Sequence, residues 1–316
     1  MEAHVKEQEA KVVQQYIHAV PNFSEGRRRE VIEAVVAQFK GTPGVRLIDY
    51  YPDPDFNRTV IETVGEPQPL KEALLRMTAR AVELIDMNEQ QGVHPRIGAQ
   101  DTIPIFPLKG ISLESCKLLA EELGREIYER INLPVYFSGE NARKPERKSL
   151  DFIRQGQYEG LKKVAHLPGR APDIGPAALH PTAGAVIVSA GTRPLTAVNI
   201  ILGTDDLSIA KTIAKAVRGP SGGFSTVRAI GLRYRERNLV AVSMNMFDYE
   251  LTPLYRTFEV VKLEASRYGV PVIETELVGT VRQEALLLVA EHYLQLKGFN
   301  RNQVLENNLM DLLTEE

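Results

Sequence analysis

Residues 58–84, RTVIETVGEPQPLKEALLRMTARAVEL, decide the fold. The run RTVIETV is rich in β-branched side chains, which is typical of a strand. Pro67 then suits the first turn of a helix, whose apolar residues recur every three or four positions from Leu70 to Leu84. A second strand-like run, TIPIF, begins at Thr102. This part of the chain therefore predicts a β-α-β unit.

The flanking segments continue the same alternation. YIHAV at residues 16–20, a helix from Val31 to Phe39 and VRLIDYY at residues 45–51 extend the unit to β-α-β-β-α-β. The second half repeats this order with AVNIIL, a helix, VRAIGLRY, LVAVSMNM, a helix after Pro253 and VPVIETELV. Two such units predict an α+β fold of two ferredoxin-like subdomains, each a sheet with helices on one face. A cleft or tunnel between them is the expected ligand site.

Charge, Gly and Pro concentrate in GENARKPERKSLDFIRQGQ (139–157) and PGRAPDIGP (168–176), where we expect the boundary between the subdomains. The predicted organisation is an N-terminal extension over 1–15, a subdomain over 16–180, a second over 181–296 and a C-terminal tail over 297–316. Ser24 and Ser112 suit the N-cap positions of the helices that follow them.

Composition excludes several classes of function. The chain has 316 residues, a formal net charge of −3 and one cysteine, Cys116, which argues against a duplex-binding surface and an internal disulfide. Neither a signal peptide nor a membrane-spanning apolar stretch is present, so we expect a cytoplasmic protein without a membrane partner. The scattered histidines lack zinc-ligand spacing, and the glycines around residue 222 lack dinucleotide spacing, so no metal or nicotinamide cofactor is predicted.

The densest cluster of reactive residues is GVHPRIGAQD, residues 92–101, which precedes the TIPIF strand. Pro95 disfavours helical backbone at His94, so the imidazole is expected to project from an extended turn. An imidazole titrates near neutral pH, which suits general acid-base catalysis, and Arg96 and Asp101 add a fork-shaped donor and a carboxylate. A loop histidine bonded to a nearby carbonyl fits the same pattern, and these residues alone leave both interpretations open.

Three further segments could contact a ligand. The segment NFSEGRRR, which begins at Asn22, places arginines at the start of a helix, where anions bind. The segment DPDFNR forms a turn between two strands, and its last two residues are Asn57 and Arg58. Solvated turns would explain both segments equally well. The third segment, residues 173–184 (DIGPAALHPTAG), is rich in Gly and Pro, which suits either a rigid loop that lines a ligand or a linker.

Taken in order along the chain, several motifs resemble the formiminotransferase family. The resemblance runs from about Ala19 to Tyr293, and many motifs in register make it specific. The motifs are VPNFSEG, NRTV, ELIDM, HPRIGAQD, PVYF, QYEGL, DIGPAALHPTAGA, IAKAVR, AVSMN and TPLYRTFEVVKLEA.

The resemblance implies a two-subdomain transferase of histidine degradation and one-carbon metabolism, usually a homodimer, that binds folate between its halves. The implied substrates are N-formimidoyl-L-glutamate, as donor, and tetrahydrofolate as co-substrate, with or without a polyglutamyl tail. His94 lies in the family's catalytic H-P-R segment. The implied folate-contacting segment contains Gly175, Pro176, His180 and Pro181.

The donor's chemistry suggests further roles. Arg27, Arg58 and Arg96 are candidates for its carboxylates, because a planar fork matches them. Asp101 or Glu25 could stabilise the cationic amidine. Together, the candidate substrate-binding and folate-binding residues are Asn22, Glu25, Arg27, Asn57, Arg58, Arg96, Asp101, Gly175, Pro176, His180, Pro181 and Asn245.

Alternative functions stay open at this level. The donor could be N-formyl-glutamate, which the sequence does not separate from the formimidoyl compound. A folate-binding relative without turnover is suggested by Val93, where many family members have a glutamate immediately before the histidine. A nucleic-acid module is disfavoured, because an aromatic RNA-binding strand and a basic face are both lacking.

Overall fold

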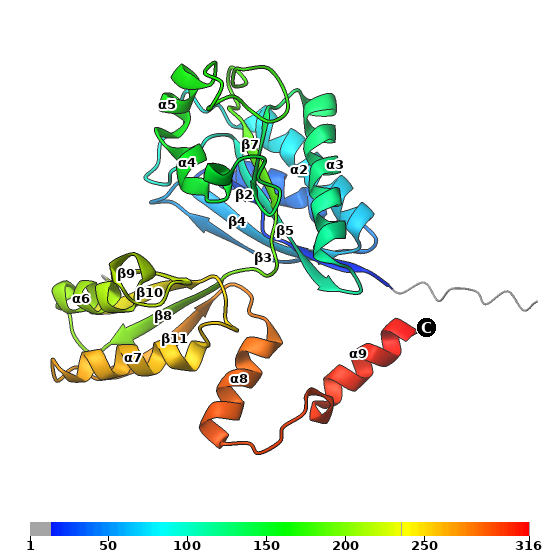
Figure 1. Ribbon diagram of the computed structural model, residues 1–316. Helices are drawn as coiled ribbons and strands as arrows, with labels where there is room; N and C mark the ends of the chain where they lie inside the picture. Colours follow the sequence, from blue (N-terminus) through cyan, green and yellow to red (C-terminus); the bar gives the residue numbers. More distant parts are fainter. Residues whose placement is uncertain (1–13, 235, 316) are drawn as a thin grey trace, which may run out of the picture. The chain divides into compact units, whose positions relative to one another are not determined.

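The computed structural model describes residues 14–234 and 236–315 (Figure 1). Most of the predicted N-terminal extension, residues 1–13, therefore lies outside the described residues. The chain divides between Thr192 and Arg193 into two compact units. Each unit contains one β-sheet with helices, so the protein is a mixed α/β protein of two subdomains.

The first unit is built on a seven-stranded sheet. Its elements in chain order are β1 (Tyr16–Ala19), β2 (Asn22–Phe23), α1 (Arg29–Val36), β3 (Val45–Asp53), β4 (Arg58–Gly65), α2 (Pro67–Leu84), β5 (Gln100–Lys109), α3 (Leu113–Ile131), β6 (Val135–Gly139), α4 (Leu150–Arg154), α5 (Gln157–Val164) and β7 (Val186–Ala190).

The strands β1 and β2 both lie between β4 and β5, and β3 flanks β4; these pairs are all antiparallel. Beyond β5 the sheet continues with β7 and β6, which run parallel to it. Because β7 follows residue 180 in the chain and pairs with β5, for example Thr102 with Ile187, residues 181–192 belong to the first unit. The structural division lies at Thr192 and Arg193, about a dozen residues beyond the boundary expected from composition.

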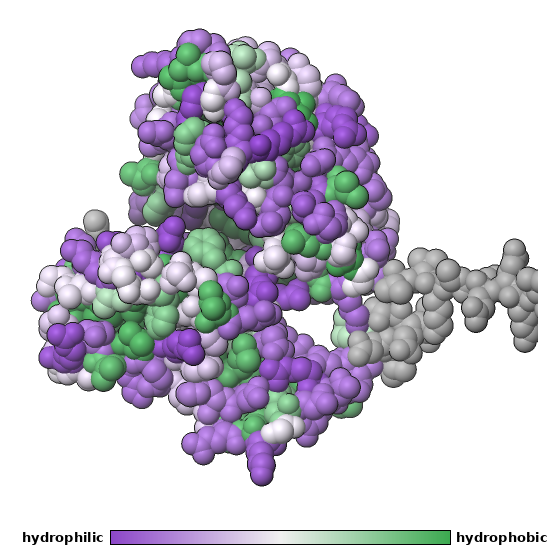
Figure 2. All heavy atoms as spheres, viewed as in Figure 1, coloured by the Kyte–Doolittle hydropathy of each residue, from purple (hydrophilic) through white to green (hydrophobic). Residues whose placement is uncertain are grey.

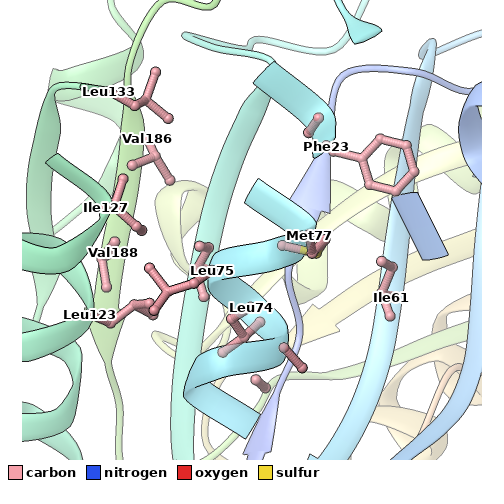
Figure 3. Packing of buried hydrophobic residues seen from close by; sticks show 14 of the residues in the cluster. Phe23, Ile61, Leu74, Leu75, Met77, Leu123, Ile127, Leu133, Val186 and Val188 are labelled. Carbon is pink, nitrogen blue, oxygen red and sulfur yellow. The ribbon is translucent and has the colours of Figure 1, made fainter. Parts of the chain in front are cut away.

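The main core of this unit lies between the sheet and the helices α1, α2 and α3. Figure 3 shows Leu74 and Met77 of α2 and Leu123 and Ile127 of α3 packed with buried residues of the strands. Pro67 is the first residue of α2, and the Ser112 side chain accepts a hydrogen bond from the amide of Ser115 at the start of α3. Both helix starts are confirmed. Each long helix buries one apolar stripe, as its periodicity predicts.

The region expected to connect the subdomains contains two short helices, α4 and α5. Ile153 of α4 and Leu161 of α5 form a second buried cluster with Tyr136, Ala185 and other residues around β6 and β7. The segment is thus part of the first unit. Its packing places Arg154, the last residue of α4, against Asp101 at the start of β5.

The second unit has the predicted order β-α-β-β-α-β. Its sheet is antiparallel with strand order β11-β8-β10-β9, and its core contains residues of β8, β9, β10, α6 and α7. The elements are β8 (Thr196–Leu202), α6 (Leu207–Val217), β9 (Val227–Tyr234), β10 (Leu239–Met246), α7 (Leu254–Ser266) and β11 (Val272–Val278), followed by α8 (Gln283–Leu294) and by α9 (Leu305–Glu315) as far as Met310, where the unit ends.

The visible surface is mainly hydrophilic, with hydrophobic residues in separate small patches (Figure 2). Scattered exposed apolar side chains are normal for a folded protein. Within the described part of the chain, no helix combines the length and the apolar character that a membrane span requires.

Candidate active site

His94 lies in the loop between α2 and β5, and its side chain is only 5% exposed. Backbone hydrogen bonds hold this loop against residues 183–185: the amide of Ala99 donates to the carbonyl of Ala183, and the amide of Ala185 donates to the carbonyl of Ile97. The His94 ring lies in a buried setting. A histidine in this position has fixed neighbours, and those neighbours decide its chemistry.

Two charged groups face the two nitrogens of the His94 ring. A terminal nitrogen of Arg58 is 3.3 Å from Nδ1, and Oδ2 of Asp101 is 3.5 Å from Nε2. Because a guanidinium can only donate, Nδ1 must act as an acceptor, and the proton of the neutral ring is assigned to Nε2, facing the carboxylate. The Nε2 contact is too long for a good hydrogen bond and acts as a charge contact. Phe56 meets the ring edge-on, with centroids 6.4 Å apart.

Asp101 is completely buried and both of its carboxylate oxygens have partners. Oδ1 accepts a hydrogen bond of 2.8 Å from the amide of Ile97, while Oδ2 forms an ion pair with the guanidinium of Arg154 in addition to its contact with His94. Burial raises the pKa of Asp101, but Arg154, His94 and the Ile97 amide outweigh it and hold that pKa below its ordinary value. Asp101 is therefore a carboxylate at neutral pH.

The surroundings also keep His94 neutral. Burial is the largest effect and lowers the pKa of the imidazole, and the positive charges of Arg58 and Arg154 lower it further. Asp101 opposes this shift. At pH 7 the ring is accordingly a free base that can accept a proton, with a carboxylate in place to stabilise the resulting imidazolium.

Buried polar atoms without a hydrogen-bond partner gather around this histidine. Nine such side-chain atoms occur among the described residues, and five of them lie at or near His94. Gln100 precedes Asp101 in β5, and its side-chain amide donates to the carbonyl of Asn22, which brings Asn22 into the same group. These five are Asn22 Oδ1, Arg58 Nε, His94 Nε2, Gln100 Oε1 and Arg154 Nε. Native structures rarely leave such atoms unsatisfied, so their clustering indicates a site that a polar ligand completes.

The segment from Asn22 to Arg28 forms one wall beside this loop. Glu25 is buried and accepts hydrogen bonds from the amides of Arg27 and Arg28 as well as from the Arg28 side chain. Burial raises the pKa of Glu25, but these donors together hold it below its ordinary value. The prediction that Ser24 caps the next helix is wrong, because its hydroxyl donates to the carbonyl of Gly98, and the N-cap of α1 is Arg28, which makes no side-chain capping hydrogen bond.

Asn57 connects three loops. Its Oδ1 accepts from the amide of Gly26 at 2.9 Å, and its Nδ2 donates to the carbonyl of Gln91 at 2.7 Å. The residue adopts a left-handed conformation with φ of 50°, which asparagine tolerates better than most residues. Asn57 thus holds Arg58 at the site, whereas Arg27 is exposed and donates to the carbonyl of Pro54.

Arg96 lies two residues after His94 in sequence, but its side chain contacts a different set of residues. Its guanidinium is buried and donates to Gln90, Gln157 and the carboxylate of Glu159. An open pocket of about 410 Å³ is lined by these groups. Its lining residues are Gln91, Gly92, Arg96, Gly156, Gln157 and Glu159. A ligand carboxylate could reach Arg96 only by displacing Glu159.

The predicted folate-contacting segment divides into two parts. His180 lies beside the His94 loop: its Nδ1 accepts from the amide of Ala183, and Gly184 pairs with Gly98. Pro181 contributes its carbonyl, which accepts from Tyr158. Burial lowers the pKa of His180.

Gly175 and Pro176 lie in the second part, an exposed turn that begins where Ile174 pairs with Val135. Asn245 belongs to the second unit, on β10, and is exposed. The structure therefore brings together His94, Arg58 and Asp101, with Asn22, Glu25, Asn57, His180 and Pro181 in the surrounding loops.

Arg154 was missed by sequence reasoning, because its segment was interpreted as part of a charged connection. A weak signal was present: Ser149 precedes a short amphipathic run with Ile153 on its apolar side, and the structure shows Ser149 capping α4. Nothing in the spacing connects Arg154 to Asp101, 53 positions earlier. Their contact arises only from tertiary packing.

In the described ranges, 14–234 and 236–315, no group of three or more His, Cys, Asp or Glu side chains is arranged to hold a metal ion.

Comparison with known families covers nearly the whole chain. Residues 16–191 match the N-terminal subdomain of the formiminotransferase domain, and residues 197–314 match the formiminotransferase domain itself. The two matched regions meet where the structure divides into its two units. The fold and the site thus define a two-subdomain protein of the transferase type, and the chain belongs to the formiminotransferase family.

Named relatives narrow this class. The chain is 42% identical over 295 residues to glutamate formimidoyltransferase of Streptococcus pyogenes serotype M1, covering 93% of this chain and 98% of that protein. It is 39% identical over 295 residues to glutamate formimidoyltransferase of Thermoplasma acidophilum, covering 93% and 97%. The formimidoyltransferase-cyclodeaminase of Mus musculus is 39% identical over 284 residues, which are 88% of this chain and 52% of that longer protein.

Proposed function

We propose that this protein is a glutamate formimidoyltransferase, which transfers the formimidoyl group of N-formimidoyl-L-glutamate to N5 of tetrahydrofolate. The relatives with that printed name match it over nearly their full length. The observation that carries the mechanism is the His94 ring, neutral and buried, with an accepting nitrogen on one side and the Asp101 carboxylate on the other.

In the proposed reaction His94 moves one proton. As N5 of the folate attacks the amidine carbon, Nδ1 of His94 takes the proton that N5 loses, and Asp101 stabilises the imidazolium across Nε2. His94 then returns the proton to the glutamate nitrogen as the bond between that nitrogen and the carbon breaks. A single group that serves first as base and then as acid contributes roughly a hundredfold to ten-thousandfold in rate.

Arg58 is the best placed of the three candidate arginines for a donor carboxylate. Its Nε is buried without a partner, and one terminal nitrogen covers Nδ1 of His94. Movement of this guanidinium onto the donor would leave Nδ1 free for the folate. Arg96 is already paired with Glu159, and Arg27 is exposed. An Arg→Lys series at these positions should raise the KM for the donor most at Arg58; equal effects at all three, or none, would contradict this assignment.

The finer roles of the remaining residues follow the same proposal. Asn22 and Gln100 offer unpartnered oxygen atoms to donors of the folate ring, while Glu25 and Asn57 hold the loops. His180, Pro181, Gly175, Pro176 and Asn245 remain predicted folate contacts. A homodimer, a cytoplasmic location and a polyglutamyl folate tail also stay predictions.

The test compares two donors on the same enzyme. Transfer to tetrahydrofolate should occur from N-formimidoyl-L-glutamate, and His94→Ala should lose nearly all of it while melting within a few degrees of the wild type. Preference for N-formyl-L-glutamate would keep the site and change the substrate. Folate binding without turnover of either donor would favour the non-catalytic alternative and contradict the proposal.

A further inference from the structure

Arg154 contacts the candidate catalytic machinery only through another residue. It ends α4, its side chain is 15% exposed, and its guanidinium pairs with Oδ2 of Asp101. The same oxygen is 3.5 Å from Nε2 of His94. One carboxylate oxygen is therefore shared between a permanent cation and a titratable ring.

The protonation state of Asp101 decides which nitrogen of His94 carries the ring proton. Oδ1 of Asp101 accepts from the Ile97 amide, and Oδ2 is the oxygen that faces the ring. If Asp101 were protonated at Oδ2, it would donate to Nε2 and force the ring proton onto Nδ1. That proton would then point at the guanidinium of Arg58, a second donor 3.3 Å away. The base form needed at Nδ1 exists only while Asp101 is ionised.

We propose that Arg154 is a positioning residue of the transfer reaction, which keeps Asp101 ionised and thereby keeps the lone pair of His94 on Nδ1. This inference rests on the proposed function of His94. Arg154 supplies the positive charge that a carboxylate with no exposed surface needs in order to stay ionised. It also limits how strongly Asp101 attracts a proton to the ring, so the histidine is not trapped as an imidazolium.

The charged groups that face the His94 ring are Asp101 from the start of β5, Arg58 from β4 and Arg154 from α4. Removing the charge of Arg154 takes one cation from a closely coupled pair of titratable groups. Whether the extra proton then settles on the ring or on the carboxylate, the pair binds it at higher pH. An upward shift of about one to two pH units is expected for the loss of a charge that shares one carboxylate oxygen with the ring in a partly buried site.

The experiment uses the full-length protein with Arg154→Met, Arg154→Lys and a matched control, Arg170→Met. Arg170 donates to the carbonyls of Phe152, Ile153 and Gln155 and so supports the same short helix. The readout is the NMR titration of the His94 ring, assigned by the signal lost in His94→Gln. The pH profile of kcat/KM is recorded alongside it.

We expect the apparent pKa of the His94 pair to rise in Arg154→Met by about one to two units, and the acidic limb of kcat/KM to move with it. Arg154→Lys and Arg170→Met should stay within a few tenths of a unit of the wild type. A wild-type titration in Arg154→Met would overturn the proposal, as would an equal shift in Arg170→Met, because both results would mean that Arg154 only supports the helix.

Two further outcomes are distinguishable. If the wild type transfers neither donor, or His94→Gln keeps its turnover, the proposed function fails, while the ring titration still decides the role of Arg154. If Arg154→Met does not fold, Arg154→Gln takes its place. Failure of both to fold, with Arg170→Met folded, would show that Arg154 serves the fold alone and would overturn the positioning role.

Discussion

Replacing Asp101 by asparagine is the sharpest test of how His94 works. The substitution preserves the shape of the side chain and removes its charge. Because Oδ1 must keep accepting from the Ile97 amide, the new NH₂ group takes the place of Oδ2 and points at both His94 and Arg154. A donor then faces Nε2, so the ring proton is driven to Nδ1, where the proposed reaction needs a lone pair.

The size of the effect follows from the contact of 3.5 Å between Oδ2 and Nε2. At an effective dielectric constant of about 20, a unit charge at that distance stabilises an imidazolium by about 5 kcal/mol. Arg154 offsets much of this, so we expect a net loss of about 2 kcal/mol and a fall of about 1.5 units in the pKa of His94. The wrong tautomer adds to this loss, and kcat should fall by about 10³-fold or more.

The assay measures kcat and kcat/KM for Asp101→Asn from pH 5 to 9, together with the ring titration. The acidic limb should move to lower pH, opposite in sign to the shift expected for Arg154→Met. Asp173→Asn is the matched control, because Asp173 also accepts a backbone amide, from Phe137, and pairs with a buried arginine, Arg147. The reasoning is refuted if Asp101→Asn keeps kcat within tenfold of the wild type, or if Asp173→Asn shifts the acidic limb equally.

Three other predictions concern the frame of the site. In Gly98→Ala the new Cβ would lie 2.1 Å from a backbone carbonyl oxygen, so we expect a large fall in Tm. In the control, Gly160→Ala, the new Cβ meets open space in α5, and the free energy of unfolding should rise by up to about 1 kcal/mol. Arg96→Met should destabilise by about 2 kcal/mol or more because it leaves buried acceptors unpaired, while Glu159→Gln, at a side chain 57% exposed, should cost less than about 1 kcal/mol in denaturant unfolding. Burial raises the pKa of Cys116 to about 11, so a thiol reagent at pH 8 should label it only in the unfolded protein; fast labelling of the native protein would contradict the buried placement.

Local signals predicted much of the fold. The apolar stripe of α2, with Pro67 at its start, and the cap at Ser112 are confirmed because they depend on interactions within one helical turn. The strand β7 was not predicted, and the expected boundary was placed before it, because its partner β5 lies some 80 residues earlier and a parallel pairing leaves no local mark. The helices α4 and α5 are short, and their charged sequence resembles that of a connection.

The site was predictable only in part. The H-P-R segment identified His94, and its neighbouring carboxylate Asp101 follows seven residues later, at the start of β5. The sequence marked Arg58 as a ligand candidate and gave Arg154 no role, because the contacts of Arg58 with His94 and of Arg154 with Asp101 both depend on tertiary packing. Arg96 was expected at the ligand and is instead engaged by Glu159, a partner that sequence spacing does not reveal.

The valine before the histidine argues less strongly against catalysis than its sequence position suggested. Val93 is 70% exposed, so a carboxylate in its place would stand mostly in water and act on the ring through a screened, high-dielectric path. The carboxylate that faces Nε2 of His94 is Asp101, which has no exposed surface and is held ionised by Arg154 and the Ile97 amide. Since the attraction between charges increases as water is excluded, the buried Asp101 acts on the basicity of His94 more strongly than an exposed glutamate at position 93 would.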